Sequence, residues 1–159
     1  MKKLLYLAVI LGAGYFLFQK FETEIFNAVP QEIRRKVFSV DIPVEYRGKF
    51  VSDLKANTDW IRQQNYKPKV QSILISVTGK QTIEIGARES ITTYQGKAVP
   101  STDEVVEKGP GYIVVGGYDE GKDKFVRTRL EKDGDGFWIF PEELRERIPG
   151  FKERYRRVE

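Results

Sequence analysis

The chain has 159 residues, and its 27 Lys and Arg against 23 Asp and Glu give a formal net charge of +4. This length predicts one domain with a short appendage, and charges of both signs in near balance do not indicate a nucleic-acid partner. Hydrophobic residues make up 40% and charged residues 31% of the chain, as in folded globular proteins. Cysteine and histidine are absent, which excludes disulfides, metal sites built on Cys or His, a thiol nucleophile and a Ser-His-Asp triad.

The N-terminus has the pattern of a membrane anchor. A basic start precedes Leu4–Phe18, which contains no charged residue. These residues span about 22 Å as a helix, and extending the helix to Phe21 brings it close to the ~30 Å hydrocarbon core. We expect residues 1–20 to be an uncleaved signal anchor, with the following domain on the periplasmic, extracytoplasmic side. The alternative is a signal peptide cut at Gly12-Ala13-Gly14, which would leave a new terminus of exposed apolar residues.

A helical stalk is expected over residues 21–43. Apolar residues recur at steps of three and four from Phe21 to Val37, and Pro30 predicts a break in this helix. The apolar stripe belongs either to a linker that continues the membrane helix or to a surface for a partner helix, and we prefer the linker. The basic residues at 34–36 favour the opposite membrane orientation.

Residues 44–150 show the alternation typical of β-strands, interrupted by glycine turns every 8 to 14 residues. A strand at Tyr46–Val51 is followed by a helix at Leu54–Asn65, and Ser52-Asp53 is suited to cap that helix. The remaining expected strands are Val70–Val77, Gln81–Ile85, Glu89–Tyr94, a weaker segment at Lys97–Val106, Tyr112–Tyr118, Lys124–Leu130 and Phe137–Phe140.

These eight short strands, with no long helix between those that follow Pro68, predict a mainly β fold, an antiparallel up-and-down barrel with one helix after the first strand. Closure removes the two free edges that an open sheet would expose. Gly116-Gly117 interrupts a strand, which predicts a bulge or a barrel corner. Pro141 is expected to begin a C-terminal helix that ends near Ile148, and residues 151–159 are expected to form a charged tail.

The strand that begins Gly48-Lys49-Phe50, the up-and-down run and the C-terminal helix together resemble the lipocalin-like (calycin) barrels. The resemblance covers Val44 to about Ile148. The family's first strand normally carries Gly-x-Trp where this chain has Phe50, and the helix at Leu54–Asn65 departs from the usual lipocalin arrangement. The resemblance implies an eight-stranded barrel and does not identify a ligand.

One segment has the spacing of a metal site. Counted from Glu131, the spacing matches an EF-hand loop and makes Asp133, Asp135 and Glu142 weak calcium candidates. An Asp-Gly-Asp-Gly hairpin turn explains the same residues without a metal, and we prefer that interpretation. No motif brings a carboxylate pair or a Ser-Lys pair together, so we expect neither enzymatic activity nor a cofactor.

Aromatic residues and arginines supply the candidates for ligand or partner contact. Arg127 and Arg129 share one face of a strand with Phe125. There they either bind an anionic group or pair with carboxylates on the outer face of the barrel, and we prefer the outer face. Aromatic residues are 13% of the chain and either fill the barrel or line a cup within it. The candidates are Trp60, Tyr94, Tyr112, Phe125, Arg127, Arg129 and Trp138.

Two functions are compatible with these features. The first is a membrane-anchored, non-catalytic envelope protein whose barrel acts as an interaction or accessory subunit, contacting a protein partner or further copies of itself. The second is a tethered carrier or sensor of a small apolar ligand held inside the barrel. We prefer the first, because the sequence predicts an anchor and only permits a pocket. An apolar cavity open at one end would favour the second.

Overall fold

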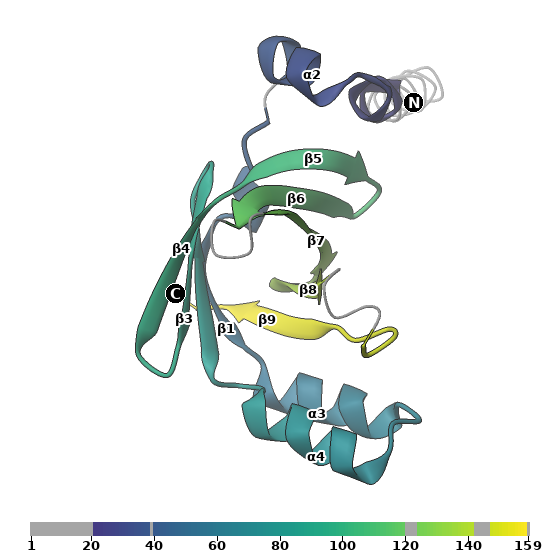
Figure 1. The fold of residues 1–159 in the computed structure, drawn as a ribbon, viewed down its shortest axis with the longest axis vertical. Helices are drawn as coiled ribbons and strands as arrows, with labels where there is room; N and C mark the ends of the chain where they lie inside the picture. The colour runs from purple at the N-terminus through teal and green to yellow at the C-terminus, as the bar shows by residue number, and fades with distance from the viewer. Residues whose placement is uncertain (1–20, 39, 120–123, 142–146, 159) are drawn as a thin grey trace, which may run out of the picture.

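The computed structural model describes residues 21–38, 40–119, 124–141 and 147–158 (Figure 1). The expected anchor at Leu4–Phe18 lies outside these residues, and so does most of the expected C-terminal helix. Within the described ranges, no helix combines the length and the apolar character needed to cross a membrane.

In the described part of the chain, nine strands form one antiparallel sheet that curves into a nearly closed barrel (Figure 1). The mainly β, antiparallel barrel predicted from the glycine turns is thus confirmed. Around the wall the strands run in the order β4-β3-β2-β1-β9-β8-β7-β6-β5. Their bounds are β1 (Gly48–Ser52), β2 (Gln81–Ile85), β3 (Glu89–Tyr94), β4 (Lys97–Thr102), β5 (Glu104–Gly109), β6 (Tyr112–Asp119), β7 (Lys124–Asp133), β8 (Gly136–Pro141) and β9 (Glu153–Arg157).

The strands differ from the prediction in three places. Val70–Val77 is not a strand but most of helix α4 (Pro68–Val77), because Pro68 is suited to the first turn of a helix and α3 packs alongside. The weak segment Lys97–Val106 forms two strands, β4 and β5, instead of one. The expected charged tail contains β9, which pairs with both β1 and β8. The described barrel therefore has nine strands rather than eight, and its order is not a simple up-and-down meander.

The barrel closes where the end of β4 approaches β6. A Cβ atom at Gly117 would lie 2.5 Å from the carbonyl oxygen of Thr102 and 2.7 Å from the carboxylate of Asp103, so this approach requires glycine. The neighbouring strand β5 carries a bulge between Val105 and Glu107. The irregularity that Gly116-Gly117 predicted is therefore the seam of the barrel.

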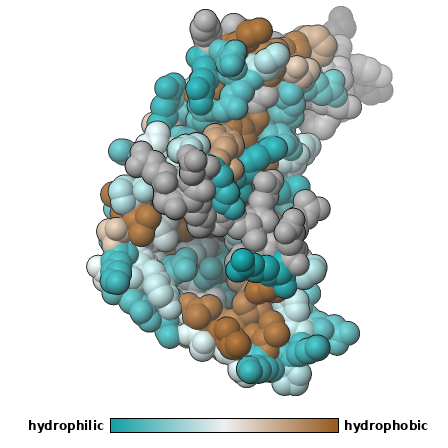
Figure 2. All heavy atoms as spheres, viewed as in Figure 1, coloured by the Kyte–Doolittle hydropathy of each residue, from teal (hydrophilic) through white to brown (hydrophobic). Residues whose placement is uncertain are grey.

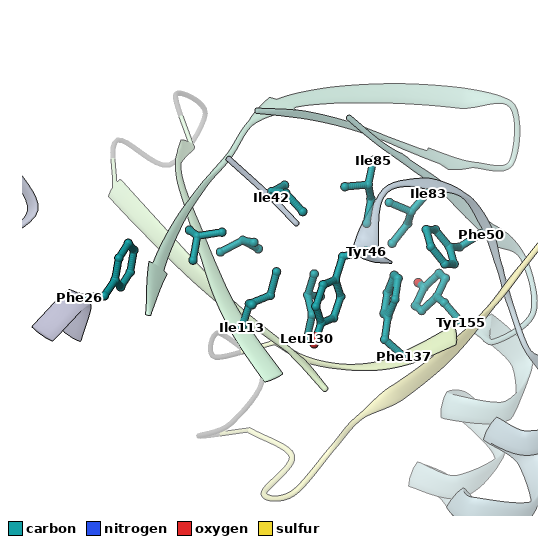
Figure 3. Close-up of a cluster of buried hydrophobic side chains, with 12 residues drawn as sticks. Phe26, Ile42, Tyr46, Phe50, Ile83, Ile85, Ile113, Leu130, Phe137 and Tyr155 are labelled. Carbon is teal, nitrogen blue, oxygen red and sulfur yellow. The ribbon is translucent and has the colours of Figure 1, made fainter. Parts of the chain in front are cut away.

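Aromatic and aliphatic side chains fill one part of the barrel interior. The ring centroid of Phe137 is 4.5 Å from that of Phe50 and 6.1 Å from that of Tyr155. Tyr46 belongs to the short helix η1 (Val44–Tyr46), and its ring centroid is 6.3 Å from that of Phe137. Figure 3 shows these rings together with Ile42, Ile83, Ile85, Ile113 and Leu130, all pointing into the barrel.

The segment predicted as a stalk is helical and packs on the barrel. Residues 21–28 are helical, the helix breaks before Pro30 as predicted, and α2 (Gln31–Val37) follows. Phe26 is buried, and its ring centroid is 5.7 Å from that of Phe38. In Figure 3 Phe26 lies apart from the side chains inside the barrel, beside the N-terminal helices.

Hydrogen bonds attach this N-terminal arm, residues 21–43, to the barrel wall. The Arg35 guanidinium holds the Glu104 carboxylate, with Nη2 to Oε1 at 2.7 Å. Further along, the Val40 carbonyl accepts from the Val105 amide at 2.8 Å, and Ile42 donates to Ala87 across the seam at 2.8 Å. The chain thus joins the barrel before residue 44, and the arm is not a free linker.

A helical hairpin of α3 (Leu54–Gln63) and α4 lies at the other end of the barrel (Figure 1). Helix α3 begins as predicted after Asp53, whose carboxylate accepts from the Ala56 amide at 3.0 Å. Leu54, Ile73 and Val77 leave much of their side chains exposed. Figure 2 shows hydrophobic residues gathered at this end of the molecule.

Candidate functional site

The barrel holds an open cavity of about 1510 Å³ beside its aromatic core. Each of the strands from β2 to β9 contributes residues to its lining. On β7, the alternation of side chains places Val126, Thr128 and Leu130 at the cavity and Arg127 and Arg129 on the outer face. The interior is therefore hollow over part of its length.

The cavity wall is largely apolar and continues into an apolar rim. Ile83, Ile85, Val115 and Leu130 line the inner part and are buried. Large apolar side chains at the opening stay exposed, a surface that attracts an apolar molecule from water. These rim residues are Ile91, Val99, Tyr118 and Phe125.

Polar side chains gather on the β9 side of the cavity. The Tyr155 hydroxyl donates to Oε1 of Gln81 at 2.6 Å, and the Glu153 carboxylate lines the cavity with them. Burial raises the pKa of Glu153, although hydrogen bonds to its carboxylate oppose the rise. Burial, together with the neighbouring Glu153, also raises the pKa of Tyr155, which keeps its hydroxyl protonated as a donor.

A buried network holds Glu153 in position. The hydroxyls of Ser52, on β1, and of Thr78, at the end of α4, both donate to Oε1 of Glu153. The Ser52 oxygen in turn accepts from the Gly79 amide at 2.8 Å and from Nδ2 of Asn57 at 3.2 Å. Because β1, β9 and both helices contribute, the carboxylate is fixed by the fold itself.

Two ion pairs and a hydrogen-bonded carboxylate lie on the opposite side of the cavity. Arg35 binds Glu104, and Arg88 forms an ion pair with Asp41. Burial favours a higher pKa for Glu104, but the hydrogen bond and charge of Arg35 outweigh it and lower the pKa below its usual value. The Asp103 carboxylate accepts from two serine hydroxyls, at 2.6 and 2.9 Å.

Four of the residues selected from the sequence lie on β6 and β7. On the outer face, the Arg129 guanidinium carbon is 3.8 Å from the centroid of the Tyr112 ring, and Arg127 pairs with Glu107 at 3.0 Å. This is the outer position preferred from the sequence. Phe125 differs from these three residues, because it covers Gly116 and reaches the cavity rim.

The two tryptophans meet on the outer wall. The ring centroids of Trp60 on α3 and Trp138 on β8 are 6.3 Å apart, and Lys152 places Nζ 4.1 Å from the Trp138 ring. This contact joins α3 to the barrel and does not line the cavity. Tyr94 is half-buried at the end of β3, in register with Gln81 on β2. None of these three residues is among the described lining of the cavity.

The calcium candidates belong to an ion-pair cluster around Arg154. Its guanidinium donates to Oδ2 of Asp133 at 2.8 Å and to Oδ1 of Asp135 at 3.1 Å, and it also binds Asp53 at 2.9 Å. The hydrogen bond from Arg154 lowers the pKa of Asp133. The preferred hairpin turn is confirmed by the pairing of β7 with β8. Glu142 lies outside the described residues, and among those described no group of metal ligands is found.

Glu153 and Tyr155, which lie on the β9 side of the cavity, are not among the candidates that the sequence indicates. The charge of the run Glu153-Arg154-Tyr155-Arg156-Arg157 predicts a solvated tail, whereas the structure forms β9 there. Its alternation was nevertheless a signal, since Glu153 and Tyr155 fall on one face of a strand and Arg154 and Arg156 on the other.

No protein-family model, curated protein or solved structure matches this chain significantly. What the fold and the cavity define is a general class: a nearly closed antiparallel β-barrel with an internal cavity. The predicted resemblance to lipocalin-like barrels holds at this level of architecture.

Proposed function

We propose that this domain binds a small, mostly apolar molecule inside its barrel and acts as a carrier or sensor of that molecule. The observation that carries the proposal is the cavity of about 1510 Å³ with an apolar wall. Ligand pockets in proteins commonly enclose about 300–1,000 Å³, so the space is ample for one ligand. The exposed rim formed by Ile91, Val99, Tyr118 and Phe125 supports access for an apolar molecule.

In this proposal the N-terminus tethers the barrel to a membrane. Leu4–Phe18 supplies the apolar span, and the basic start before it favours a domain on the extracytoplasmic side. Tethering suits an apolar ligand, because such molecules concentrate in the bilayer. The described lining suits binding rather than catalysis, since its serines, Ser90 and Ser101, both donate to the Asp103 carboxylate.

A second candidate function, an accessory subunit of a membrane assembly, is favoured by a separate observation. Phe21, Ile25 and Ile33 on the N-terminal arm are 64%, 38% and 52% exposed. Apolar side chains spaced along one helical segment are suited to packing on a partner helix or on another copy of the chain.

Native mass spectrometry of the full-length protein, extracted gently from its host in detergent, tests the proposal. We expect a small molecule bound at one copy per chain. The variant Thr128→Trp should weaken its binding, because the indole projects from the cavity wall into the space for the ligand, whereas Glu84→Trp, on the exposed outer face of β2, should keep it. A barrel that is empty while a defined protein partner copurifies would contradict the carrier proposal and favour the accessory subunit.

A further inference from the structure

The lining of the cavity carries an uneven distribution of charge. On one side, Arg35 and Arg88 are occupied by Glu104 and Asp41. The Asp103 carboxylate on this side accepts from two serine hydroxyls. On the β9 side, the hydrogen bonds that fix Glu153 come from neutral hydroxyls, those of Ser52 and Thr78. Within the described lining, the charge presented to a ligand on the β9 side is therefore a carboxylate.

This carboxylate distinguishes between polar end groups on an apolar ligand. A carboxylic acid would bring a second negative charge beside Glu153 in a partly buried site, where like charges repel strongly. An ammonium group would supply the opposite charge and donate hydrogen bonds to Glu153 and to Oε1 of Gln81. Burial raises the pKa of Glu153, and the hydrogen bonds that its carboxylate accepts from described residues come from hydroxyl groups.

The dimensions fit a ligand with an apolar chain. From Gln81 to Ile85 the cavity wall on β2 extends about 13 Å, at 3.3 Å per residue. Gln81 lies at the polar side, while Ile83 and Ile85 continue the wall as apolar surface. An octyl chain can lie along this wall with its end group at Glu153.

Resting on the proposed ligand-binding function, we infer that the cavity selects amphiphilic amines, whose ammonium group Glu153 holds, and discriminates against the corresponding carboxylic acids. Neutral alcohols of the same length bind with intermediate affinity, because they donate a hydrogen bond without supplying a charge.

The test compares octylamine, 1-octanol and octanoate as stabilisers of the full-length protein in mild detergent at neutral pH. Ligands that bind the folded state raise the melting temperature, and at a given concentration the rise is larger for the ligand that binds more tightly. We expect octylamine to act at about a tenfold lower concentration than 1-octanol, and octanoate to act least. In Glu153→Gln the advantage of octylamine over 1-octanol should disappear while 1-octanol still stabilises. Glu84→Gln, which removes an exposed carboxylate from the outer face of β2, should keep the wild-type order.

The outcomes separate this inference from the function on which it rests. If octanoate stabilises the wild type as strongly as octylamine does, the inference is overturned and the proposed binding function still stands. This comparison needs no variant. An unchanged response of Glu153→Gln to octylamine would overturn it too. If no probe stabilises the wild type, or if Thr128→Trp responds as the wild type does, the cavity takes no ligand and the proposed function falls with the inference.

Discussion

Asn27 and Lys108 are joined by two hydrogen bonds: Nδ2 of Asn27 donates to the Lys108 carbonyl at 2.8 Å, and its Oδ1 accepts from the Lys108 amide at 3.0 Å. A side-chain amide here satisfies both backbone groups of a residue on β5, at the end of the sheet order. Exposed strand edges are prone to pair with other chains, and the N-terminal arm protects this one. The same contact connects the barrel to the segment that leads towards the predicted anchor.

Replacing Asn27 with Ala should release the arm from β5. Both backbone groups of Lys108 lose their partner, which costs about 1–2 kcal/mol of stability and exposes the amide to solvent. Hydrogen exchange of the Lys108 amide should therefore accelerate. Asn27→Asp is the graded control, because a carboxylate still accepts from the amide but no longer donates to the carbonyl. Equal exchange rates in the wild type and in Asn27→Ala would show that the arm does not protect this edge.

The turns of this fold were predictable because their glycines have a local physical role. Gly79, Gly96, Gly111 and Gly134 adopt positive φ angles of 75°, 79°, 74° and 59°, which glycine accommodates without strain. Each lies between two predicted strands, and the hairpins at Gly96, Gly111 and Gly134 followed from short-range information. Gly79 instead joins helix α4 to β2. The arm was predictable only in part: its helical period was evident, whereas its hydrogen bonds to β5 join residues far apart in the chain.

Two segments were wrongly predicted because distant contacts decide their structure. Val70–Val77 is rich in β-branched residues, yet it is helical, with Leu74 as its most buried residue and α3 beside it. Glu153–Arg157 is too charged to indicate a strand, yet it fills the space between β1 and β8 and buries Tyr155. The cavity depends on the second segment, since Glu153 and Tyr155 of β9 line it.

Arg154 should be the most sensitive charged residue on the outer wall. Its guanidinium is 15% exposed and binds carboxylates of the α3 cap and of the β7–β8 turn. Arg154→Met leaves Asp53 and Asp133 without their cation, and we expect a loss of about 2 kcal/mol. This is less than for a fully buried pair, because Asp133 is half-exposed. Urea unfolding measures the loss, and Arg156→Met on the exposed end of the same strand is the control. Similar midpoints for the two variants would contradict the prediction.

Calcium should not stabilise the protein through the β7–β8 turn. The Asp133 and Asp135 carboxylates already accept hydrogen bonds from Arg154, so a cation would have to displace the guanidinium. We expect an unchanged melting temperature in millimolar calcium chloride. A rise that disappears in Asp133→Asn would show that the weak calcium assignment was correct and that Arg154 yields to the metal.

Gly117 should tolerate no side chain. In Gly117→Ala the new methyl group meets the Thr102 carbonyl at 2.5 Å, and backbone on both sides of the seam must move. We expect a loss of about 1–3 kcal/mol, typical of overpacking. Gly116→Ala is a matched control, because its methyl group meets the Phe125 ring, which is 43% exposed and able to turn away. Thermal unfolding should separate the two variants, and equal melting temperatures would mean that the seam is not tightly closed.

Glu153 should make stability depend on pH in a direction opposite to that of most carboxylates. Burial raises its pKa in the folded protein above the ordinary value of 4.5. Between the unfolded and folded pKa values the folded state therefore holds more protons, so the free energy of unfolding falls as the pH rises through this window. Glu153→Gln cannot ionise, while its amide oxygen still accepts from Ser52 and Thr78. The stability of the wild type relative to this variant should therefore decline as the pH rises above about 4.5.

Urea unfolding of both proteins between pH 4 and pH 8 measures this difference, with Glu84→Gln used to subtract the effect of net charge. Asp133 contributes in the other direction, because Arg154 lowers its pKa in the folded protein. The stability that Asp133 contributes is complete at a pH above the ordinary pKa of an aspartate, and it is lost as the pH falls below that pKa. Because Asp133 is common to all the variants, its contribution cancels in the comparison. A wild type that gains stability relative to Glu153→Gln as the pH rises would mean that the carboxylate is better solvated, or better paired, than its place in the cavity indicates.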